Sequence, residues 1–164
     1  MGWRVSFAET DKILSKPKAA PFLRSLEECE DNELRITVAG AKIGDCAVGT
    51  FDGTALGRIL SQCRPIESDE NLAFEITFES YIIYQVRNES FCSYDPQEIR
   101  HGKFLIIFEK SKLLEYLTIS TDTCRFADGS FYPVKWTHYG IYTQNHVIDV
   151  ISQCEPNVLR LTRS

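Results

Sequence analysis

The sequence lacks any long hydrophobic run. Its clearest uninterrupted apolar stretch, residues 104–108, has five residues, whereas a helix that spans a bilayer needs about 20. The first residues also lack the apolar core of about 7–15 residues that a secretory signal requires. We therefore expect no membrane segment and predict a soluble protein located in the cytoplasm.

An excess of basic charge is also missing. The 164 residues include 18 Lys and Arg against 23 Asp and Glu, which gives a formal net charge of −5. Proteins that bind nucleic acid neutralise phosphates with a basic surface, so this balance disfavours a nucleic-acid partner. The content of 43% hydrophobic and 12% aromatic residues predicts a folded globular chain. Its length fits a single domain, residues 1–164.

Motifs for metals, nucleotides and common hydrolytic chemistry are absent. There is no C-x-x-C pair, no P-loop, no G-x-G-x-x-G, no G-x-S-x-G and no H-E-x-x-H, which are spacings that bring ligands or nucleophiles together. We predict no metal, no cofactor and no catalytic residue. Without an export signal, the six cysteines are expected to be reduced and mostly to serve as small core residues.

Residues 74–87 show the strongest periodicity. Six of the seven even-numbered residues are apolar, and five of the seven odd-numbered ones are polar or charged. Because successive side chains of a strand point to opposite faces, this pattern predicts a long, half-buried strand. No Gly, Pro or Asn interrupts it, which favours one bent strand over a hairpin.

Other segments predict additional strands. Leu34, Ile36 and Val38 alternate with polar residues, residues 104–108 are typical of a strand covered on both faces, and a weaker strand at 42–51 follows a possible turn at 39–41. Residues 134–142 and 146–151 are rich in β-branched and aromatic side chains, and the residues between them can turn, so a hairpin is expected.

Two apolar stripes predict helices. The first is formed by Leu56, Ile59, Leu60 and Cys63, with Asp52 or Thr54 as the cap, and the second by Leu113, Leu114 and Leu117, with Ser111 as the cap. A weaker helix is expected between residues 21 and 29. The order of elements predicts an α+β domain, in which a mainly antiparallel β-sheet carries two or three helices packed on one face.

The candidate site residues come from the polar side of the long strand and from the C-terminal hairpin. Tyr81, Gln85, Arg87 and Glu89 share the odd-numbered face, and Tyr and Arg are enriched in binding hot spots; an ordinary solvated sheet face is the alternative. His138 and His146 are possible bases. If residues 146–149 are extended, His146 and Asp149 point to opposite faces and form no direct dyad.

Two parts of the sequence resemble a family of small bacterial proteins of uncharacterised function. They are FEITFESY (74–81) with YQVRNES (84–90), and HYGIY (138–142) with NHVIDV (145–150). The resemblance covers roughly the second two-thirds of the chain and implies a bacterial, cytoplasmic setting. It implies a shared structural or binding role for Arg87, Asn88, Glu89, His138, Asn145 and Asp149, and no activity comes with it.

Three functions are consistent with the sequence. We predict a non-enzymatic module that binds a protein partner, most concretely a bacterial immunity or antitoxin-like inhibitor whose acidic charge complements a basic toxin. The alternative is a small-ligand-binding domain or hydrolase with a pocket near His138, His146 and Asp149. The third is a structural subunit that forms a homo-oligomer. Convergence of these residues with Arg87 in one cleft would favour a ligand, and a flat exposed Tyr and Arg face would favour a partner.

Overall fold

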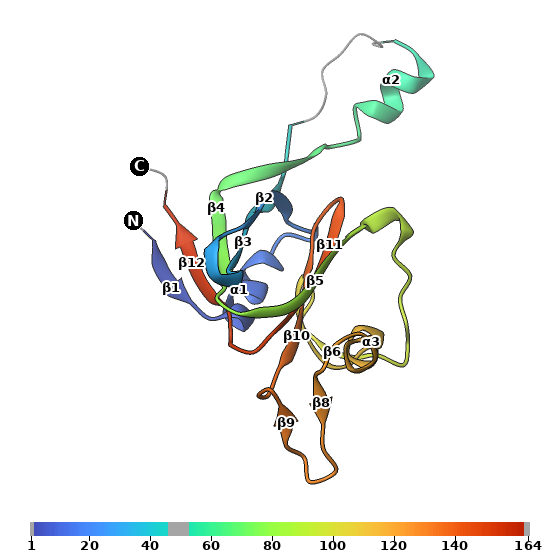
Figure 1. The fold of residues 1–164 in the computed structure, drawn as a ribbon. Helices are drawn as coiled ribbons and strands as arrows, with labels where there is room; N and C mark the ends of the chain where they lie inside the picture. The colour runs from blue at the N-terminus through green and yellow to red at the C-terminus, as the bar shows by residue number, and fades with distance from the viewer. Residues whose placement is uncertain (1, 46–52, 163–164) are drawn as a thin grey trace.

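The described part of the chain is mainly antiparallel β-sheet with three α-helices, which agrees with an α+β class (Figure 1). The computed structural model describes residues 2–45 and 53–162. The first sheet contains, in spatial order, β1 (Trp3–Val5), β12 (Asn157–Leu161), β4 (Ile66–Phe78), β3 (Leu34–Ile43) and β2 (Phe22–Glu28). The second sheet contains β5 (Tyr81–Asn88), β11 (His146–Ser152), β10 (Thr137–Tyr142), β7 (Leu105–Lys110) and β6 (Ile99–His101). A separate two-stranded pair is formed by β8 (Cys124–Arg125) and β9 (Phe131–Tyr132).

The two sheets share one hydrophobic core. Ile36, Phe74 and Ile76 of the first sheet and Ile141 and Ile148 of the second are fully buried in the same cluster. Complete burial of such side chains contributes about 1.5–3 kcal/mol each to folding. The alternation predicted at 34–38 and 74–78, the buried strand near 104–108 and the C-terminal hairpin are all confirmed.

The α-helices occupy different places. They are α1 (Phe7–Leu14), α2 (Ala55–Leu60) and α3 (Lys112–Ser120), and two short 3-10 turns are η1 (Glu30–Asn32) and η2 (Glu89–Phe91). Helix α1, which the sequence patterns did not predict, begins after Ser6, whose Oγ accepts a hydrogen bond from the backbone N–H of Glu9 (3.2 Å). It buries Phe7 and Leu14 in the shared core.

Helix α3 covers part of the outer face of the second sheet, where Leu113 and Leu117 pack with Trp136 and Ile151. Its predicted cap, Ser111, is confirmed. Helix α2 lies far from both sheets (Figure 1) and buries no residue. Its existence and its Thr54 cap are confirmed, but its apolar stripe is exposed. The helices are therefore not gathered on one face of a sheet.

The expected continuous strand at 74–87 is wrong. The chain leaves the first sheet after Phe78 and enters the second at Tyr81. Ser152 Oγ and Gln153 N both donate to the carbonyl of Ser80, at 2.9 and 3.2 Å, and fix this corner. A strand that bends from one sheet into another keeps its alternation on each side of the corner, so periodicity alone does not reveal the break.

Two β-bulges explain two further errors. The segment predicted as a helix at 21–29 forms β2, where a bulge between Leu23 and Ser25 puts Leu23 and Leu26 against the core at a helix-like spacing of three. The turn predicted at 39–41 lies inside β3, with a bulge at Gly40. A Cβ at Gly40 would lie 2.6 Å from Leu72 Cδ2, so a larger residue there would displace the Leu72 side chain. Most of the strand predicted at 42–51 lies outside the described residues.

The cysteines do not fill the core as expected. Cys63 and Cys154 are exposed, and Cys29, Cys92 and Cys124 are half-buried; all five are free thiols. Cys46 lies outside the described residues. Among the residues described, no helix combines the length and apolar character needed to cross a membrane.

Candidate functional site

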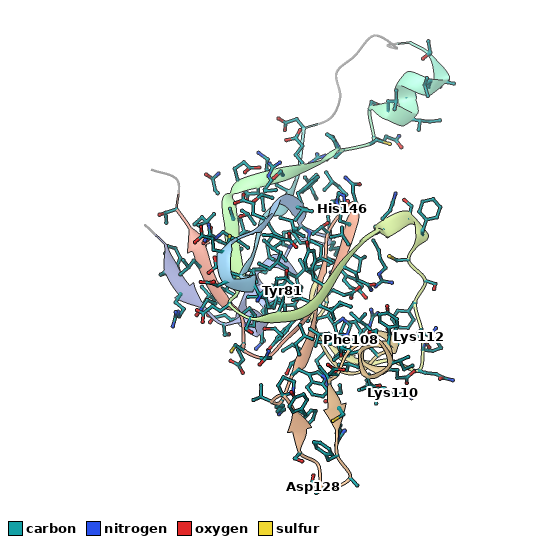
Figure 2. All side chains as sticks on the ribbon, viewed as in Figure 1. Tyr81, Phe108, Lys110, Lys112, Asp128 and His146 are labelled. Carbon is teal, nitrogen blue, oxygen red and sulfur yellow. The ribbon has the colours of Figure 1, made fainter. Side chains whose placement is uncertain are left out.

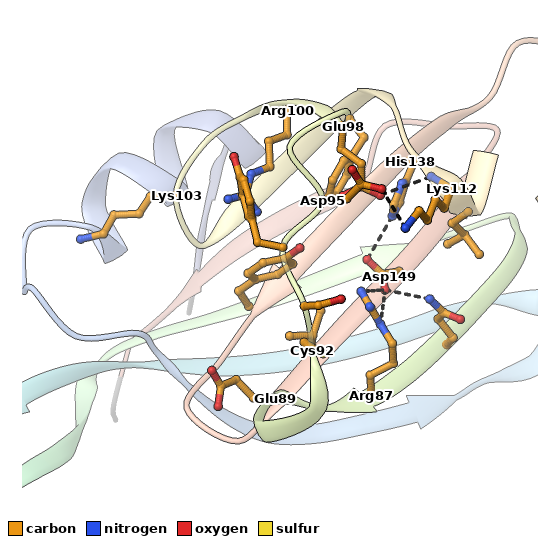
Figure 3. A pocket seen from close by; sticks show the side chains of 17 residues that line it. Arg87, Glu89, Cys92, Asp95, Glu98, Arg100, Lys103, Lys112, His138 and Asp149 are labelled. Atoms are coloured by element: carbon orange, nitrogen blue, oxygen red, sulfur yellow. Dashed lines mark hydrogen bonds and ion pairs between the residues drawn. The ribbon is translucent and has the colours of Figure 1, made fainter. Parts of the chain in front are cut away.

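A cavity of about 300 Å³ lies between the outer face of the second sheet and the segment that follows β5 (Figure 3). We call it the Arg87 cavity. Strands β5, β10 and β11 supply its floor and the segment 89–103 supplies charged side chains at its wall. Its principal lining residues are Gln85, Arg87, Arg100, Lys103, His138 and Asp149.

Asp149 is the centre of the site. It is 1% exposed, and its carboxylate accepts hydrogen bonds from two side chains of β5. Gln85 Nε2 donates to Oδ2 at 3.0 Å, and Arg87 donates to the same oxygen from Nε at 3.1 Å and from Nη2 at 2.7 Å. A buried carboxylate needs such donors to offset its lost hydration. The pairing holds the guanidinium in a fixed place while 41% of the Arg87 side chain stays exposed.

His138 extends the network away from the cavity. Its Nε2 lies 3.1 Å from Asp149 Oδ1 and its Nδ1 lies 2.7 Å from Ser111 Oγ. Because the ionised Asp149 carboxylate can only accept, the imidazole donates to it from Nε2. Ser111 Oγ also accepts the backbone N–H of Leu114 (3.1 Å), and the His138 ring stacks on Phe108 with centroids 4.1 Å apart.

The network shifts the pKa values of its members. Burial raises the pKa of Asp149, but the hydrogen bonds from His138 and Gln85, with the charge of Arg87, outweigh it and the pKa lies below the usual value. For Arg87, burial acts to lower the pKa, and the Asp149 carboxylate outweighs it and raises the pKa. Both groups are therefore kept charged at neutral pH.

Two further cations and two further carboxylates of the cavity form no salt bridge among the described residues. Lys112 is paired with Asp95 at 2.8 Å. Arg100 stacks on the Tyr94 ring at 4.0 Å and Lys103 lies 4.6 Å from the Phe104 ring centre, and neither forms a salt bridge with a carboxylate in the described part of the chain. The same is true of the lining carboxylates Glu89 and Glu98, although Glu98 Oε1 accepts the backbone N–H of Lys112 at 3.2 Å.

The structure brings together five of the seven predicted binding residues. Gln85, Arg87, Glu89, His138 and Asp149 line the cavity. His146 does not: it begins β11 and is exposed, and its strand position faces away from Asp149, as its extended backbone requires.

Tyr81 is also absent from the cavity, so the predicted exposed stripe with Gln85 and Arg87 is wrong. A bulge opposite Ser152 changes the register at the start of β5 and turns Tyr81 toward the shared core. Tyr84 packs there too, with the two rings edge to face at 5.1 Å. The Tyr84 hydroxyl donates to Glu28 at 2.7 Å, and this hydrogen bond raises the pKa of Tyr84 to about 12. These tyrosines connect β5 to β2 at the edges of the two sheets.

The remaining residues implied by the family resemblance stabilise turns. Asn88 Oδ1 accepts the backbone N–H of Ser90 at 3.0 Å, and the Asn145 carbonyl accepts that of Glu89 at 3.1 Å. Neither asparagine lines the cavity.

The pairing of His138 with Asp149 was missed, although the hairpin contains a signal for it. In the β10–β11 register, Gly140 lies directly opposite Asp149, so His138, two residues before Gly140, is diagonal to Asp149 on the same face. A Cβ at Gly140 would lie 3.0 Å from the Phe108 ring, so glycine gives that ring the space it occupies beside His138. No local sequence pattern predicted the contacts of Ser111 and Phe108 with His138, because only tertiary packing brings these residues together.

No protein-family model, curated protein sequence or solved structure matches the chain. The resemblance to small bacterial proteins therefore stays a prediction. Across residues 2–45 and 53–162, no group of three His, Cys, Asp or Glu side chains is arranged to hold a metal ion.

Proposed function

We propose that the protein is a non-catalytic binding protein and that the Arg87 cavity takes a small ligand with a carboxylate or phosphate group. One observation carries this proposal: the buried Asp149 fixes Arg87 through two of its nitrogens, while part of the guanidinium side chain remains exposed at the cavity. A pre-positioned guanidinium binds such anions with little loss of side-chain entropy.

Three features support this proposal. Arg100 and Lys103 line the same cavity and form no salt bridge in the described residues, so both can pair with an anion, although Glu89 and Glu98 also line it without a salt bridge. The volume of about 300 Å³ is at the lower end of the range for small-ligand sites. The convergence of His138, Asp149 and Arg87 in one cavity is the arrangement that favours a ligand over a flat partner surface.

Binding is favoured over hydrolysis because the potential catalytic groups are buried and hydrogen-bonded to one another. Ser111 is 2% exposed, and its hydroxyl is occupied by Leu114 N–H and His138. His138 is also 2% exposed, with both ring nitrogens bonded. A general base or nucleophile has to reach its substrate, and these groups instead hold Asp149 and Arg87 in place.

The test is titration with phosphate, citrate and acetate at low ionic strength, followed by amide NMR shifts. We expect the signals of cavity-lining residues to move saturably with at least one anion. Arg87→Gln and Arg100→Gln should each weaken binding about tenfold or more, since a charged hydrogen bond contributes about 1.5–3 kcal/mol. Arg4→Gln, which removes the same charge from β1, should change it less than about twofold. Absence of any saturable shift, or equal loss in Arg4→Gln, would contradict the proposal.

A protein partner is the second candidate, and the exposed aromatic side chains beside the cavity favour it. Phe91 is 87% exposed and Tyr94 is 65% exposed, in the segment that forms the cavity wall. Exposed aromatics around an arginine are typical of interface hot spots. This is the surface by which a bacterial, cytoplasmic immunity or antitoxin-like protein would hold its toxin.

The partner candidate is tested by co-expression with the products of neighbouring genes and size-exclusion chromatography. We expect Phe91→Ser to weaken a resulting complex about tenfold or more, because truncation of a hot-spot aromatic costs about 2 kcal/mol or more. Ile119→Ser, at an equally exposed apolar residue of α3 (83%), is the control and should leave the complex intact. If no neighbouring product forms a complex, or both variants weaken it equally, this candidate is rejected.

A further inference from the structure

A second and larger cavity, of about 550 Å³, lies between α3, the β8–β9 pair and the second sheet. We call it the Trp136 cavity. Its principal lining residues are Ile107, Leu114, Arg125, Phe131, Lys135 and Trp136. Figure 2 shows Phe108 and Lys110, which also line it, beside α3. His138 lines both cavities. Its hydrogen-bond partner Asp149 lines the Arg87 cavity, and its other partner, Ser111, lines the Trp136 cavity.

The inner wall of this cavity is apolar and rigid. Trp136 is 7% exposed and packs edge to face with Phe131, with ring centroids 4.7 Å apart. It belongs to a buried cluster with Leu113, Leu117 and Ile151. Preformed aromatic walls bind apolar groups because the ligand leaves water while few protein side chains lose freedom.

Trp136 also brings a hydrogen-bond donor without a protein acceptor. Its indole N–H forms no hydrogen bond to another residue within the described ranges, and Nε1 is not among the fully buried atoms without a partner, so the N–H can donate outward. An indole N–H can donate to any oxygen acceptor within reach. A ligand that occupies the cavity and carries oxygen atoms would supply one.

The rim of the cavity favours an anion. Lys110, Arg125 and Lys135 form no salt bridge with a carboxylate of the described residues, and the Arg125 guanidinium lies 5.5 Å from the Phe131 ring centre. Two carboxylates also line the cavity, namely Glu109, which lies 2.6 Å from His101 Nε2, and Glu115. The rim therefore presents three cations against two carboxylates.

We propose that the Trp136 cavity binds an amphipathic organic acid. Its apolar chain would lie against Trp136, Phe131 and Leu114, and its carboxylate would lie at the rim, near Arg125 and Lys135. This ligand class combines the three features of the site, namely an apolar wall, an unmatched donor and a cationic rim. The proposal is independent of the ligand proposed for the Arg87 cavity.

The experiment uses tryptophan fluorescence. The chain has two tryptophans, and Trp3 is half-exposed on β1, so a Trp3→Phe protein reports Trp136 alone. Decanoate, below its micelle concentration, should shift or quench the emission saturably. Acetate should have no effect because it lacks the chain, and decyltrimethylammonium should bind about tenfold or more weakly because its charge is opposite. No saturable change with decanoate, or equal binding of the cation, would overturn the proposal.

Variants locate the binding. Thr118→Phe, on the cavity side of α3, should weaken decanoate binding about tenfold or more by filling the space, whereas Ser120→Phe on the same helix should not. Arg125→Gln should weaken binding by a similar factor, and Arg4→Gln, on β1, should leave it unchanged. Equal effects of the two phenylalanine variants, or equal effects of Arg125→Gln and Arg4→Gln, would place the ligand elsewhere and overturn the proposal. Melting curves of each variant establish that it is folded.

Discussion

Replacement of Asp149 by asparagine is expected to lower the free energy of unfolding by about 3–5 kcal/mol, because breaking one partner of a buried charge network leaves the others unpaired. The carboxylate is 1% exposed and accepts from Gln85, Arg87 and His138. Asparagine keeps the shape, but it turns an NH₂ group toward these donors. Urea unfolding at neutral pH measures the effect. The loss of stability should lie near the lower limit of this range, because the Arg87 side chain can still be hydrated.

Asp122→Asn is the matched control, since Asp122 is exposed and should change stability by less than about 0.5 kcal/mol. A loss below about 1 kcal/mol for Asp149→Asn would mean that the network contributes little to folding.

The effect of Asp149→Asn should also depend on pH. The pKa of Asp149 is lower in the folded protein than its usual value, which is about 3.9 in an unfolded chain. The carboxylate therefore stabilises the fold fully above about pH 4, and this contribution disappears as the pH falls through the lower, folded value. The difference between wild type and Asp149→Asn should shrink on acidification below about pH 4. A difference that stays constant there would contradict the role assigned to the carboxylate charge.

The second large effect is expected at Asp11, which joins α1 to β7. Asp11 is 8% exposed, and its carboxylate accepts the backbone N–H groups of Lys103 (3.0 Å), Phe104 (2.8 Å) and Leu105 (2.8 Å). Asp11→Asn replaces one acceptor oxygen with an NH₂ group and removes the charge. We expect a loss of about 3 kcal/mol, because hydrogen bonds to a charged group contribute about 1.5–3 kcal/mol each and the donors stay buried.

Urea unfolding and amide hydrogen exchange measure the effect of Asp11→Asn. The urea concentration at the unfolding midpoint should fall, and the slope of the unfolding free energy against urea concentration should not change. The amides of Phe104 and Leu105 should exchange faster than those of β10. Glu9→Gln, on the exposed side of the same helix, is the control and should change stability by less than about 0.5 kcal/mol. If hydrogen exchange at Phe104 and Leu105 were unchanged, the backbone, and not Asp11, would stabilise the segment 103–105.

Local patterns predicted the elements whose periodicity is undisturbed. The alternation of Leu34, Ile36 and Val38, the hairpin around residues 143–145 and the Ser111 cap each depend on neighbours in the chain. Bulges defeated the same reasoning elsewhere. At Leu23 and Leu26 a bulge produced a helix-like spacing inside a strand, and at Tyr81 a bulge reversed the face on which the side chain lies.

Only part of the candidate site could be predicted from the sequence. Gln85, Arg87, His138 and Asp149 were recognised as residue types suited to binding, and alternation predicted the shared face of Gln85 and Arg87. Their convergence required β5 to lie beside β11 and β11 beside β10. The β10–β11 hairpin was predicted from the sequence, but no local pattern encodes the pairing of β5 with β11. Arg100 lines the cavity because the segment after β5 folds back over it. That segment has no hydrophobic periodicity, so the sequence did not predict the position of Arg100.

The sequence by itself determined the fold class, six of the twelve strands and two of the three helices of the described residues, because backbone preferences and the burial of alternate side chains act over short distances. Only the tertiary structure decided that the chain changes sheets after Phe78, that α2 stands apart, and that His138 joins two cavities. Those outcomes depend on contacts between residues far apart in the chain, whose energies no local pattern contains.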